Sequence, residues 1–161
     1  MKVLLIVPAY NEEKNIAQTV ARIRQAQQAQ AGGMELDYVV INDGSSDGTE
    51  QICRENGFHY VTLIENLGIG GAVQTGYLYA QQHGYDVAVQ FDGDGQHDID
   101  SLPQLLAPIA AGEADFTVGS RFVRKDASGF QSTAARRMGI HLLSALIHRV
   151  THQRILDVTS G

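Results

Sequence analysis

The sequence predicts an α/β fold in which helices cover both faces of a mostly parallel β-sheet, a three-layer αβα arrangement. Short apolar runs, each long enough for one strand, alternate with segments whose apolar residues recur at helical spacing. Turns rich in Gly, Asp and Ser separate these segments. The 161 residues are 43% hydrophobic and 19% charged and contain no internal repeat, so we expect one globular domain over residues 1–161.

The expected strands are the apolar runs at residues 2–7, 36–41, 60–64, 86–91 and 116–119. The expected helices cover residues 12–29, a segment ending near residue 56, and residues 68–82, 101–111 and 134–150, with a loop at 125–132. In the first helix, Ile16, Val20 and Ile23 recur at i, i+4 and i+7 and predict its buried face. Asp47 and Glu50 are three residues apart, so we expect them to cap the second helix.

The charges divide the chain into an acidic body and a basic C-terminal part. Residues 1–118 carry 5 Lys and Arg against 16 Asp and Glu, and residues 119–161 carry 7 against 2. A duplex-DNA binder usually has a basic surface over most of its fold, so this distribution argues against a nucleic-acid partner. It suits a site for a metal cation and a phosphate-bearing ligand.

Targeting signals do not stand out in the sequence. The N-terminal apolar run is too short for a signal peptide, and no run approaches the roughly 20 apolar residues of a membrane helix. Cys53 is a single cysteine without a disulfide partner in the chain, and we expect a small core residue and a cytoplasmic setting. Residues 156–161 end without a closing helix, so we expect the protein to continue beyond them.

Acidic residues follow the strand expected at 86–91, at an end where ligands bind in open parallel sheets. Asp92 and Asp94 are two residues apart, so both carboxylates can reach one Mg²⁺ or Mn²⁺ ion. Gly93 between them lets a ligand approach the backbone, and Gln96 or His97 can add a metal ligand. Asp and Gly also form ordinary turns, and the motif alone leaves that alternative open.

The other strand ends offer contacts for a nucleotide. Asp43 can accept hydrogen bonds from a base or a ribose, and it can equally be a turn or cap residue. Pro8 provides a rigid backbone and Tyr10 an aromatic face for a base, or ordinary packing. Residues 68–71 resemble a phosphate-binding glycine loop but lack its full spacing.

Basic side chains in the C-terminal part can hold a phosphate through paired hydrogen bonds or form a solvated face. They include Arg121, Arg124, Lys125, Arg136 and Arg137. The six His residues show no zinc-binding spacing.

Five motifs in order resemble the inverting family 2 glycosyltransferases. They are VPAYNE at residues 7–12, VINDGSSDGT at 40–49, residues 66–76, FDGDGQH at 91–97 and GSRF at 119–122. The paired arginines and the closing DVTSG are most similar to polyprenyl-phosphate sugar synthases of the dolichol-phosphate mannose synthase type. The resemblance covers nearly the whole chain and implies a GT-A fold, which is Rossmann-like and binds a nucleoside-diphosphate sugar.

The resemblance also implies roles for individual residues. The donor-binding residues it implies are Pro8, Tyr10, Glu12, Asp43, Asn66, Gly70, Asp92 and Gly93. Asp92 and Asp94 would hold the Mg²⁺ or Mn²⁺ ion of this DXD motif, and Gln96 would complete its shell. Arg121 and Arg136 would hold the acceptor phosphate, with Arg137 as a close rival.

The implied reaction transfers a sugar, with inversion, from a nucleoside diphosphate to an undecaprenyl or dolichyl phosphate. It would take place at the cytoplasmic face of the membrane, in cell-envelope or polysaccharide biosynthesis. The resemblance is compatible with a full-length protein that is anchored in the membrane and with a homodimer. An ionised phosphate acceptor needs no strong general base, which fits the lack of a Glu-Asp pair in residues 116–161.

Three alternatives stay open at this point. The acceptor can be a sugar hydroxyl of a growing glycan, or the chain can be a nucleotide-sugar-binding domain without activity. Residues 91–95 also resemble the nucleophile loop of haloacid-dehalogenase-type phosphatases, although that motif normally lies on the first strand.

Overall fold

The computed structural model describes residues 1–29, 34–92 and 99–119. The chain divides into two compact units, Met1–Pro103 and Gln104–Gly161. The loop expected at residues 125–132 and the helix expected at 134–150 lie outside the described residues. The expectation of one domain over residues 1–161 stays a prediction.

The first unit is built on a four-stranded sheet in the order β3-β2-β1-β4. Its strands are β1 (Lys2–Ala9), β2 (Glu35–Asn42), β3 (Tyr60–Thr62) and β4 (Val87–Gln90). All three strand pairs are parallel, and Leu5 of β1 pairs with Tyr38 on one side and Val89 on the other. The first four predicted strands are therefore confirmed, with ends that differ by one or two residues.

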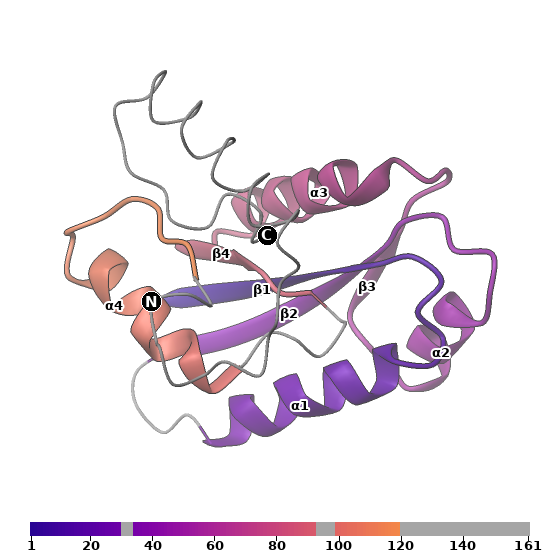
Figure 1. Ribbon diagram of the computed structural model, residues 1–161, viewed down its shortest axis with the longest axis horizontal. Coiled ribbons are helices and arrows are strands. Elements are labelled where there is room, and N and C mark those ends of the chain that lie inside the picture. The colour runs from indigo at the N-terminus through magenta and orange to yellow at the C-terminus, as the bar shows by residue number, and fades with distance from the viewer. Residues whose placement is uncertain (30–33, 93–98, 120–161) are drawn as a thin grey trace, which may run out of the picture. The chain divides into compact units, whose positions relative to one another are not determined.

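Helices cover both faces of this sheet, with α3 on one face and α1 and α2 on the other (Figure 1). They are α1 (Ile16–Ala29), α2 (Thr49–Glu55) and α3 (Gly68–Gln82). After β4, the 3₁₀ turn η1 (Ile99–Ser101) leads into α4 (Leu102–Ala110). The three-layer αβα prediction is confirmed.

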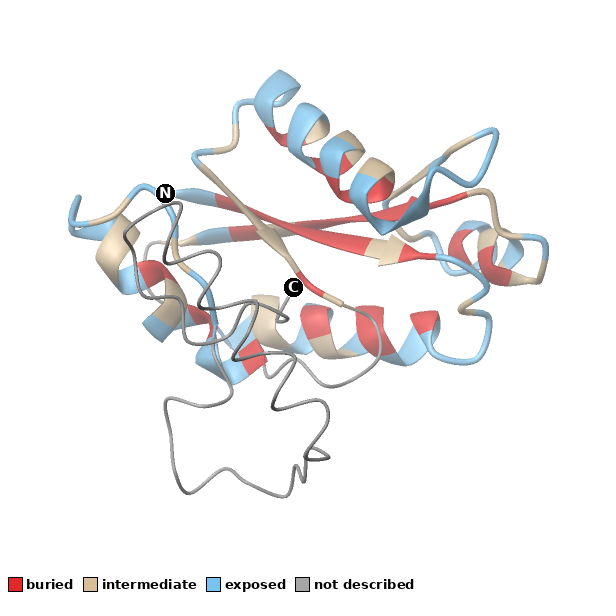
Figure 2. Ribbon diagram, turned by 45° about the horizontal axis from the view of Figure 1, so that its top comes forward, coloured by how far each residue is buried: buried red, intermediate tan, exposed pale blue. Residues whose placement is uncertain are grey.

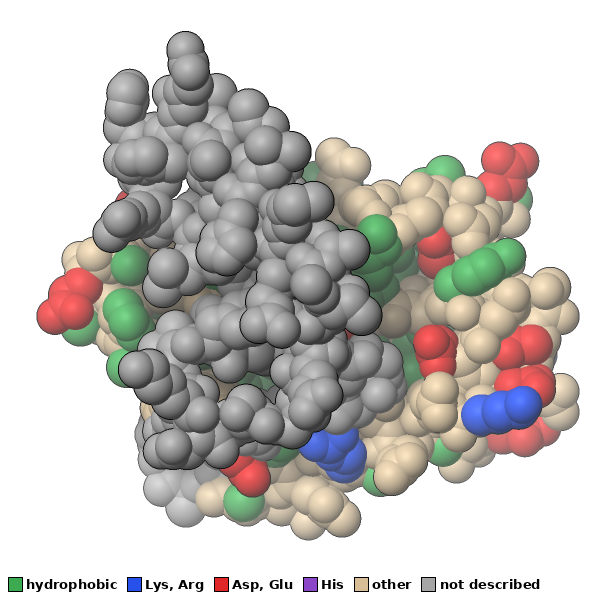
Figure 3. All heavy atoms as spheres, viewed as in Figure 1, with side chains coloured by type: hydrophobic (Ala, Val, Ile, Leu, Met, Phe, Trp, Pro, Cys, Tyr) green, Lys and Arg blue, Asp and Glu red, His purple; other side chains and the backbone are tan. Residues whose placement is uncertain are grey.

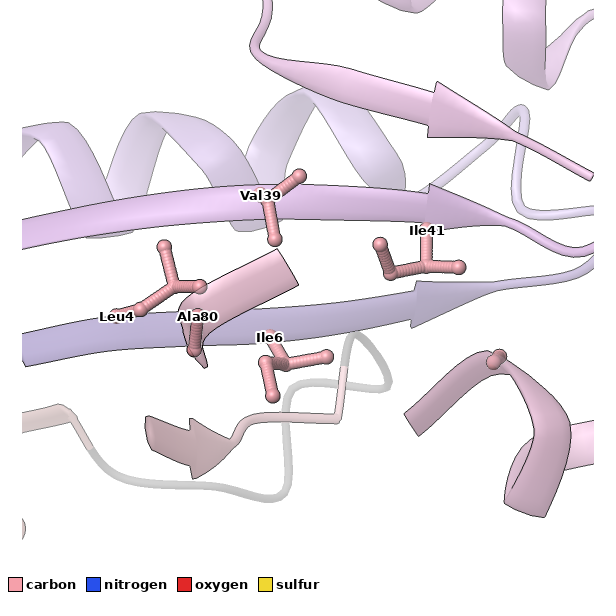
Figure 4. Packing of buried hydrophobic residues seen from close by; sticks show 6 residues of the cluster. Leu4, Ile6, Val39, Ile41 and Ala80 are labelled. Atoms are coloured by element: carbon pink, nitrogen blue, oxygen red, sulfur yellow. The ribbon is translucent and has the colours of Figure 1, made fainter. Parts of the chain in front are cut away.

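The two central strands, β1 and β2, are buried along most of their length (Figure 2) because helices cover both of their faces. The face toward α3 holds a cluster of buried residues, shown in Figure 4: Leu4, Ile6, Val39, Ile41, Ala72 and Ala80. Side chains alternate along a strand, so Val3, Leu5 and Val7 of β1 lie on the opposite face. The predicted buried face of α1 is confirmed, since Ile16, Val20 and Ile23 are at most 1% exposed.

Close packing of α3 on β1 depends on Gly76. A Cβ added at Gly76 would lie 2.3 Å from Cγ2 of Ile6, which is fully buried, whereas one added at Gly70 has nothing within 4 Å. We expect Gly76→Ala to lower the free energy of unfolding by about 1–2 kcal/mol, because overpacking outweighs the gain in helix propensity. Gly70→Ala should leave it unchanged or raise it by up to about 1 kcal/mol. Urea unfolding of both variants checks this, and equal changes would contradict it.

The prediction of a strand at residues 116–119 is wrong. These residues have no strand geometry, and Phe116 is 76% exposed. The hydroxyl of Thr117 donates to the carbonyl of Leu105 (2.9 Å). An apolar run becomes a strand only where a neighbouring strand supplies ladder hydrogen bonds, and the run itself does not reveal whether one is present.

The beginnings of two helices also differ from the predictions. The first helix begins at Ile16 and not near residue 12, because a turn precedes it in which Asn15 N donates to Glu12 O (3.0 Å). The cap of α2 is Gly48, so the capping prediction for Asp47 and Glu50 is wrong. The Glu50 side chain pairs with Arg54 within the helix (3.0 Å) and not with the helix start.

Cys53 of α2 is fully buried, as expected of a small core residue. Burial, with a smaller contribution from the charge of Glu50, raises the pKa of its thiol to about 11. At neutral pH the group is therefore a thiol and a poor nucleophile.

Candidate functional site

Pro8 marks the place where β4 leaves the sheet. The carbonyl of Ile6 accepts the N–H of Phe91 (2.8 Å), so the even-numbered residues of β1 form the backbone hydrogen bonds with β4. Pro8 has no N–H, and the ladder between these strands ends at the pair Ile6–Gln90. Asp92 follows Gln90 by two residues and lies beyond the last pair of this ladder.

Asp43 is a nearly buried carboxylate at the end of β2, with 3% of its surface exposed. Its N–H donates to Ala9 O (2.9 Å) and prolongs the pairing of β2 with β1. Its Oδ1 accepts the N–H of Leu67 (2.8 Å), the residue that precedes α3. Within the part of the chain that the structure describes, no group bonds Oδ2. One oxygen therefore holds the start of α3, and the other is available to a ligand.

Asp43 and Asp92 lie on either side of the end of β1. Strand β1 lies between β2 and β4 in the sheet, so the backbones of β2 and β4 are about 10 Å apart. Asp92 is half-buried, and its Oδ1 accepts the side-chain N–H of Gln90 (3.0 Å). The two carboxylates are spaced for an extended ligand with polar groups along its length.

Asp92 offers the hard oxygen donor that Mg²⁺ and Mn²⁺ prefer, and these ions keep coordination positions for water and ligand phosphates. The chemistry of this residue therefore fits such an ion. The other members of the predicted metal site, Gly93, Asp94 and Gln96, lie outside the described residues. In the described ranges, no three His, Cys, Asp or Glu side chains are grouped to hold a metal, so the complete ligand set stays a prediction.

Side chains join the loops that follow β1 and β2. Three consecutive N–H groups of the first loop donate to side chains of the second: Asn11 to Ser45 Oγ (3.0 Å), Glu12 to Thr49 Oγ1 (2.8 Å) and Glu13 to Asp47 Oδ2 (3.1 Å). Two backbone N–H groups donate the other way, from Ser46 to Asn11 Oδ1 (2.9 Å) and from Gly48 to Glu13 Oε2 (3.0 Å). We call these residues, 11–13 and 45–49, the loop lock.

Asp47 is a charged acceptor in the loop lock. Burial raises its pKa, but hydrogen bonds from the hydroxyl and N–H of Thr49 and from the N–H of Glu13 prevail, and the pKa lies below its ordinary value of 3.8. Because folding lowers this pKa, the stabilisation is present above the ordinary value and is lost as the pH falls through the lowered pKa. At neutral pH, Asp47 is ionised and this part of the loop lock is intact.

A third loop, which precedes α3, packs against the loop after β2. Gly44 has a φ of +65°, and a Cβ added to it would lie 2.8 Å from the backbone N of Asn66. Asn66 Oδ1 accepts the N–H of Gly68 (3.0 Å) at the beginning of α3. Asn66 thus helps to begin the helix, and a contact with a ligand stays a prediction for it.

The remaining candidates in the described ranges lie on these loops and at the beginning of α3. Tyr10 follows β1 and is 51% exposed, and Glu12 Oε2 accepts the side-chain N–H of Asn15 (2.8 Å). Gly70 is exposed in the first turn of α3. Figure 3 shows acidic side chains gathered on the side of the molecule where α2 lies. Pro8, Tyr10, Glu12, Asp43 and Asp92 thus lie at one edge of the sheet, while Arg121, Arg136 and Arg137 are outside the described residues.

The residues that hold the loops in place were not predicted from the sequence. Asn42 is fully buried, donates to Thr62 Oγ1 (3.3 Å) and accepts the N–H of Ser45 (3.3 Å). Asn11 has a φ of +57°. The position of Asn42, a polar residue at the end of an apolar strand, was a sequence signal for a structural role. The role of Asn11 is visible only in its contacts.

An open parallel sheet with polar loops gathered at the carboxyl ends of its strands defines an α/β domain of the class that binds ligands at those ends. Residues 4–159 match the family described as Glycosyl transferase family 2. The chain therefore belongs to glycosyltransferase family 2. This assignment replaces the phosphatase alternative.

Named relatives are similar over about three quarters of the chain. Undecaprenyl-phosphate mannosyltransferase of Micrococcus luteus is 35% identical over an alignment 128 positions long, which covers 76% of this chain and 49% of that protein. Polyprenol monophosphomannose synthase of Mycolicibacterium smegmatis is 33% identical over an alignment of the same length, which covers 76% of this chain and 46% of that protein. The chain spans about half the length of these relatives.

Solved structures of glucosyl-3-phosphoglycerate synthase from Mycobacterium tuberculosis share the fold. The complex with UDP matches with a TM-score of 0.60 and 20% identity, over 99% of this chain and 53% of that one. The complex with Mn²⁺, UDP-glucose and phosphoglyceric acid matches with a TM-score of 0.53 and 24% identity, over 70% of this chain and 40% of that one. The predicted GT-A fold is confirmed. Among the described helices, none has the length and apolar character needed to cross a membrane.

Proposed function

We propose that this glycosyltransferase binds the nucleoside of a nucleoside-diphosphate sugar at Asp43 and transfers the sugar to a polyprenyl phosphate. The observation that carries the donor site is the nearly buried Asp43 carboxylate, which has one oxygen bonded to Leu67 and the other available. A buried acceptor without a partner is costly, and a base N–H or a ribose hydroxyl would supply the missing donor. The acceptor class is supported by the names of the relatives, which include undecaprenyl phosphate and polyprenol.

The order of the strands suggests how the donor lies along the sheet edge. The nucleoside would bind at Asp43, with Tyr10 beside it at the end of β1, and the diphosphate would extend about 10 Å toward Asp92. Asp92, Asp94 and Gln96 would hold Mg²⁺ or Mn²⁺, which supplies positive charge to offset the charge developing on the diphosphate leaving group.

The acceptor phosphate would be held by Arg121 together with Arg136 or Arg137. Its ionised oxygen forms the new bond to the anomeric carbon, while the bond from that carbon to the diphosphate breaks and the configuration inverts. The attacking oxygen carries no proton, so this step needs no general base. A polyprenyl phosphate is confined to a bilayer, and we therefore place the reaction at the cytoplasmic membrane surface.

Calorimetric titration with UDP, GDP and dTDP, each with Mn²⁺, tests the donor site. We expect the unsubstituted chain to bind at least one of them. Asp43→Asn keeps an oxygen for the N–H of Leu67 and replaces Oδ2 by a donor group. It should weaken binding about 10- to 100-fold, the value of a hydrogen bond to a charged group.

Asp86→Asn is the matched control for this substitution. Asp86 lies just before β4, at the opposite end of the strands from Asp43, and its Oδ2 accepts the N–H of Lys2 (2.7 Å). Replacing Asp86 should therefore leave the affinity for the nucleotide unchanged. A chain that binds none of the three nucleotides, or an Asp43→Asn variant that binds as tightly as the unsubstituted chain, would refute the proposed donor site.

A further inference from the structure

The loop lock continues the pairing of β1 and β2 beyond the sheet. The ladder ends at the pair Ala9–Asn42, with one more backbone bond from Asp43 to Ala9. Beyond that point, side chains accept the backbone hydrogen bonds: each N–H of residues 11–13 donates to a side chain of residues 45–49. Two segments with non-extended backbones thus remain paired through hydrogen bonds that are specific for their side chains.

Asn11 contributes to the loop lock from both its backbone and its side chain. Its N–H donates to Ser45 Oγ, and its Oδ1 accepts from both the N–H (2.9 Å) and the hydroxyl (3.3 Å) of Ser46. Its φ of +57° lies in the left-handed region, which Asn tolerates better than most residues because its short side chain bonds locally.

The neighbours of Asn11 and of its partners are candidate ligand-binding residues. Tyr10 immediately precedes Asn11, and Asp43 lies two residues before Ser45. A shift of one loop against the other therefore changes the distance between the aromatic ring of Tyr10 and the carboxylate of Asp43. Loops that sample several such arrangements bind a ligand only in the competent fraction, and the Kd rises in proportion.

We propose that Asn11 is a positioning residue for the donor nucleoside, holding the loop that carries Tyr10 and Glu12 against the loop that carries Asp43. This inference rests on the proposed function of Asp43. Asn11 acts through Ser45 and Ser46 and not by contact with the ligand. Its loss raises the Kd of the nucleotide even when the chain remains fully folded.

Substitutions of Asn11 separate its side chain from its backbone conformation. Asn11→Gly removes the amide and still adopts a positive φ without strain, and we expect it to raise the Kd about 10-fold. Asn11→Asp keeps an oxygen acceptor for Ser46, and we expect it to stay within about threefold of the unsubstituted chain. Ser45→Ala removes one acceptor from the opposite loop and provides a milder variant, with an expected rise of about fivefold.

The measurement is calorimetry with UDP, GDP and dTDP, each with Mn²⁺, at a temperature at which thermal unfolding shows every variant to be folded. The control is Gln51→Ala, which removes an amide that bonds only within α2, to Glu55 (2.7 Å), and should leave the Kd unchanged. A purely structural role would lower the melting temperature of Asn11→Gly and leave the Kd alone.

Each outcome decides the inference. Weaker binding by Asn11→Gly and Ser45→Ala, with recovery in Asn11→Asp, supports it. Unchanged affinity in both weakening variants, in a chain whose Asp43→Asn variant binds poorly, overturns the role of Asn11 and leaves the donor site standing. Should the unsubstituted chain bind none of the nucleotides, the proposed function fails and the role of Asn11 with it.

Discussion

Asp92→Asn is expected to weaken the Mn²⁺-dependent binding of a nucleoside diphosphate by at least about 100-fold, the upper end of what loss of metal-site support costs. The Asp92 carboxylate, two residues after β4, is a hard oxygen donor, and the amide that replaces it carries no charge to attract the ion. Titration in Mn²⁺ and again with a chelator measures the metal-dependent part of the affinity.

Gln90→Ala refines this result. The side chain of Gln90 donates to Asp92 Oδ1 (3.0 Å) and orients the carboxylate without replacing it, so a smaller loss of about 10-fold is expected. Asp86→Asn again serves as the control for lost charge. Nucleotide binding that is equally tight with and without the chelator would rule out the metal-bearing role of Asp92.

Gly44→Ala should cause the largest loss of stability among the substitutions considered. The φ of +65° costs an L-residue about 1–2 kcal/mol. In addition, the new Cβ would lie 2.8 Å from backbone atoms of Glu65 and Asn66, and such overpacking costs about 1–3 kcal/mol more. Native domains are stable by about 5–15 kcal/mol, so urea unfolding should show a large fraction of the total lost.

Gly57→Ala separates the two causes. Gly57 has a φ of +58°, and a Cβ added there has nothing within 4 Å, so only the conformational cost applies. Equal destabilisation by the two substitutions would mean that the close approach of Gly44 to Asn66 is of no energetic consequence. A larger effect at Gly44, accompanied by weaker nucleotide binding, would show that this contact also holds Asp43 in place.

Local sequence patterns were sufficient for most of the secondary structure. The helix at residues 68–82 was predicted with the bounds of α3, because Gly68 follows a strand and a turn while helical spacing continues to residue 82. The strand expected at residues 116–119 failed because a strand also depends on a partner outside its own run. The predicted capping of α2 by Asp47 and Glu50 failed because the helix begins one residue later than this pair requires, after Gly48, and because Glu50 pairs with Arg54.

The candidate site was predicted as a set of residues, without their relations to one another. Turn residues after apolar runs placed Asp43 and Asp92 at strand ends. One oxygen of Asp43 accepts the N–H of Leu67, which is 24 positions away in sequence. The loop lock joins residues separated by 34 to 37 positions, and no local pattern of polar residues predicts such pairings.

The sequence by itself determined the first four strands, the presence of the three helices between them, the polar residues that follow these strands and the resemblance to a glycosyltransferase family, because periodicity and motifs are local properties. Only the tertiary structure decided that β4 lies beside β1, and that one oxygen of Asp43 is bonded to the start of α3. Strand order and loop contacts are set by packing between distant segments, and their free energy belongs to the assembled fold.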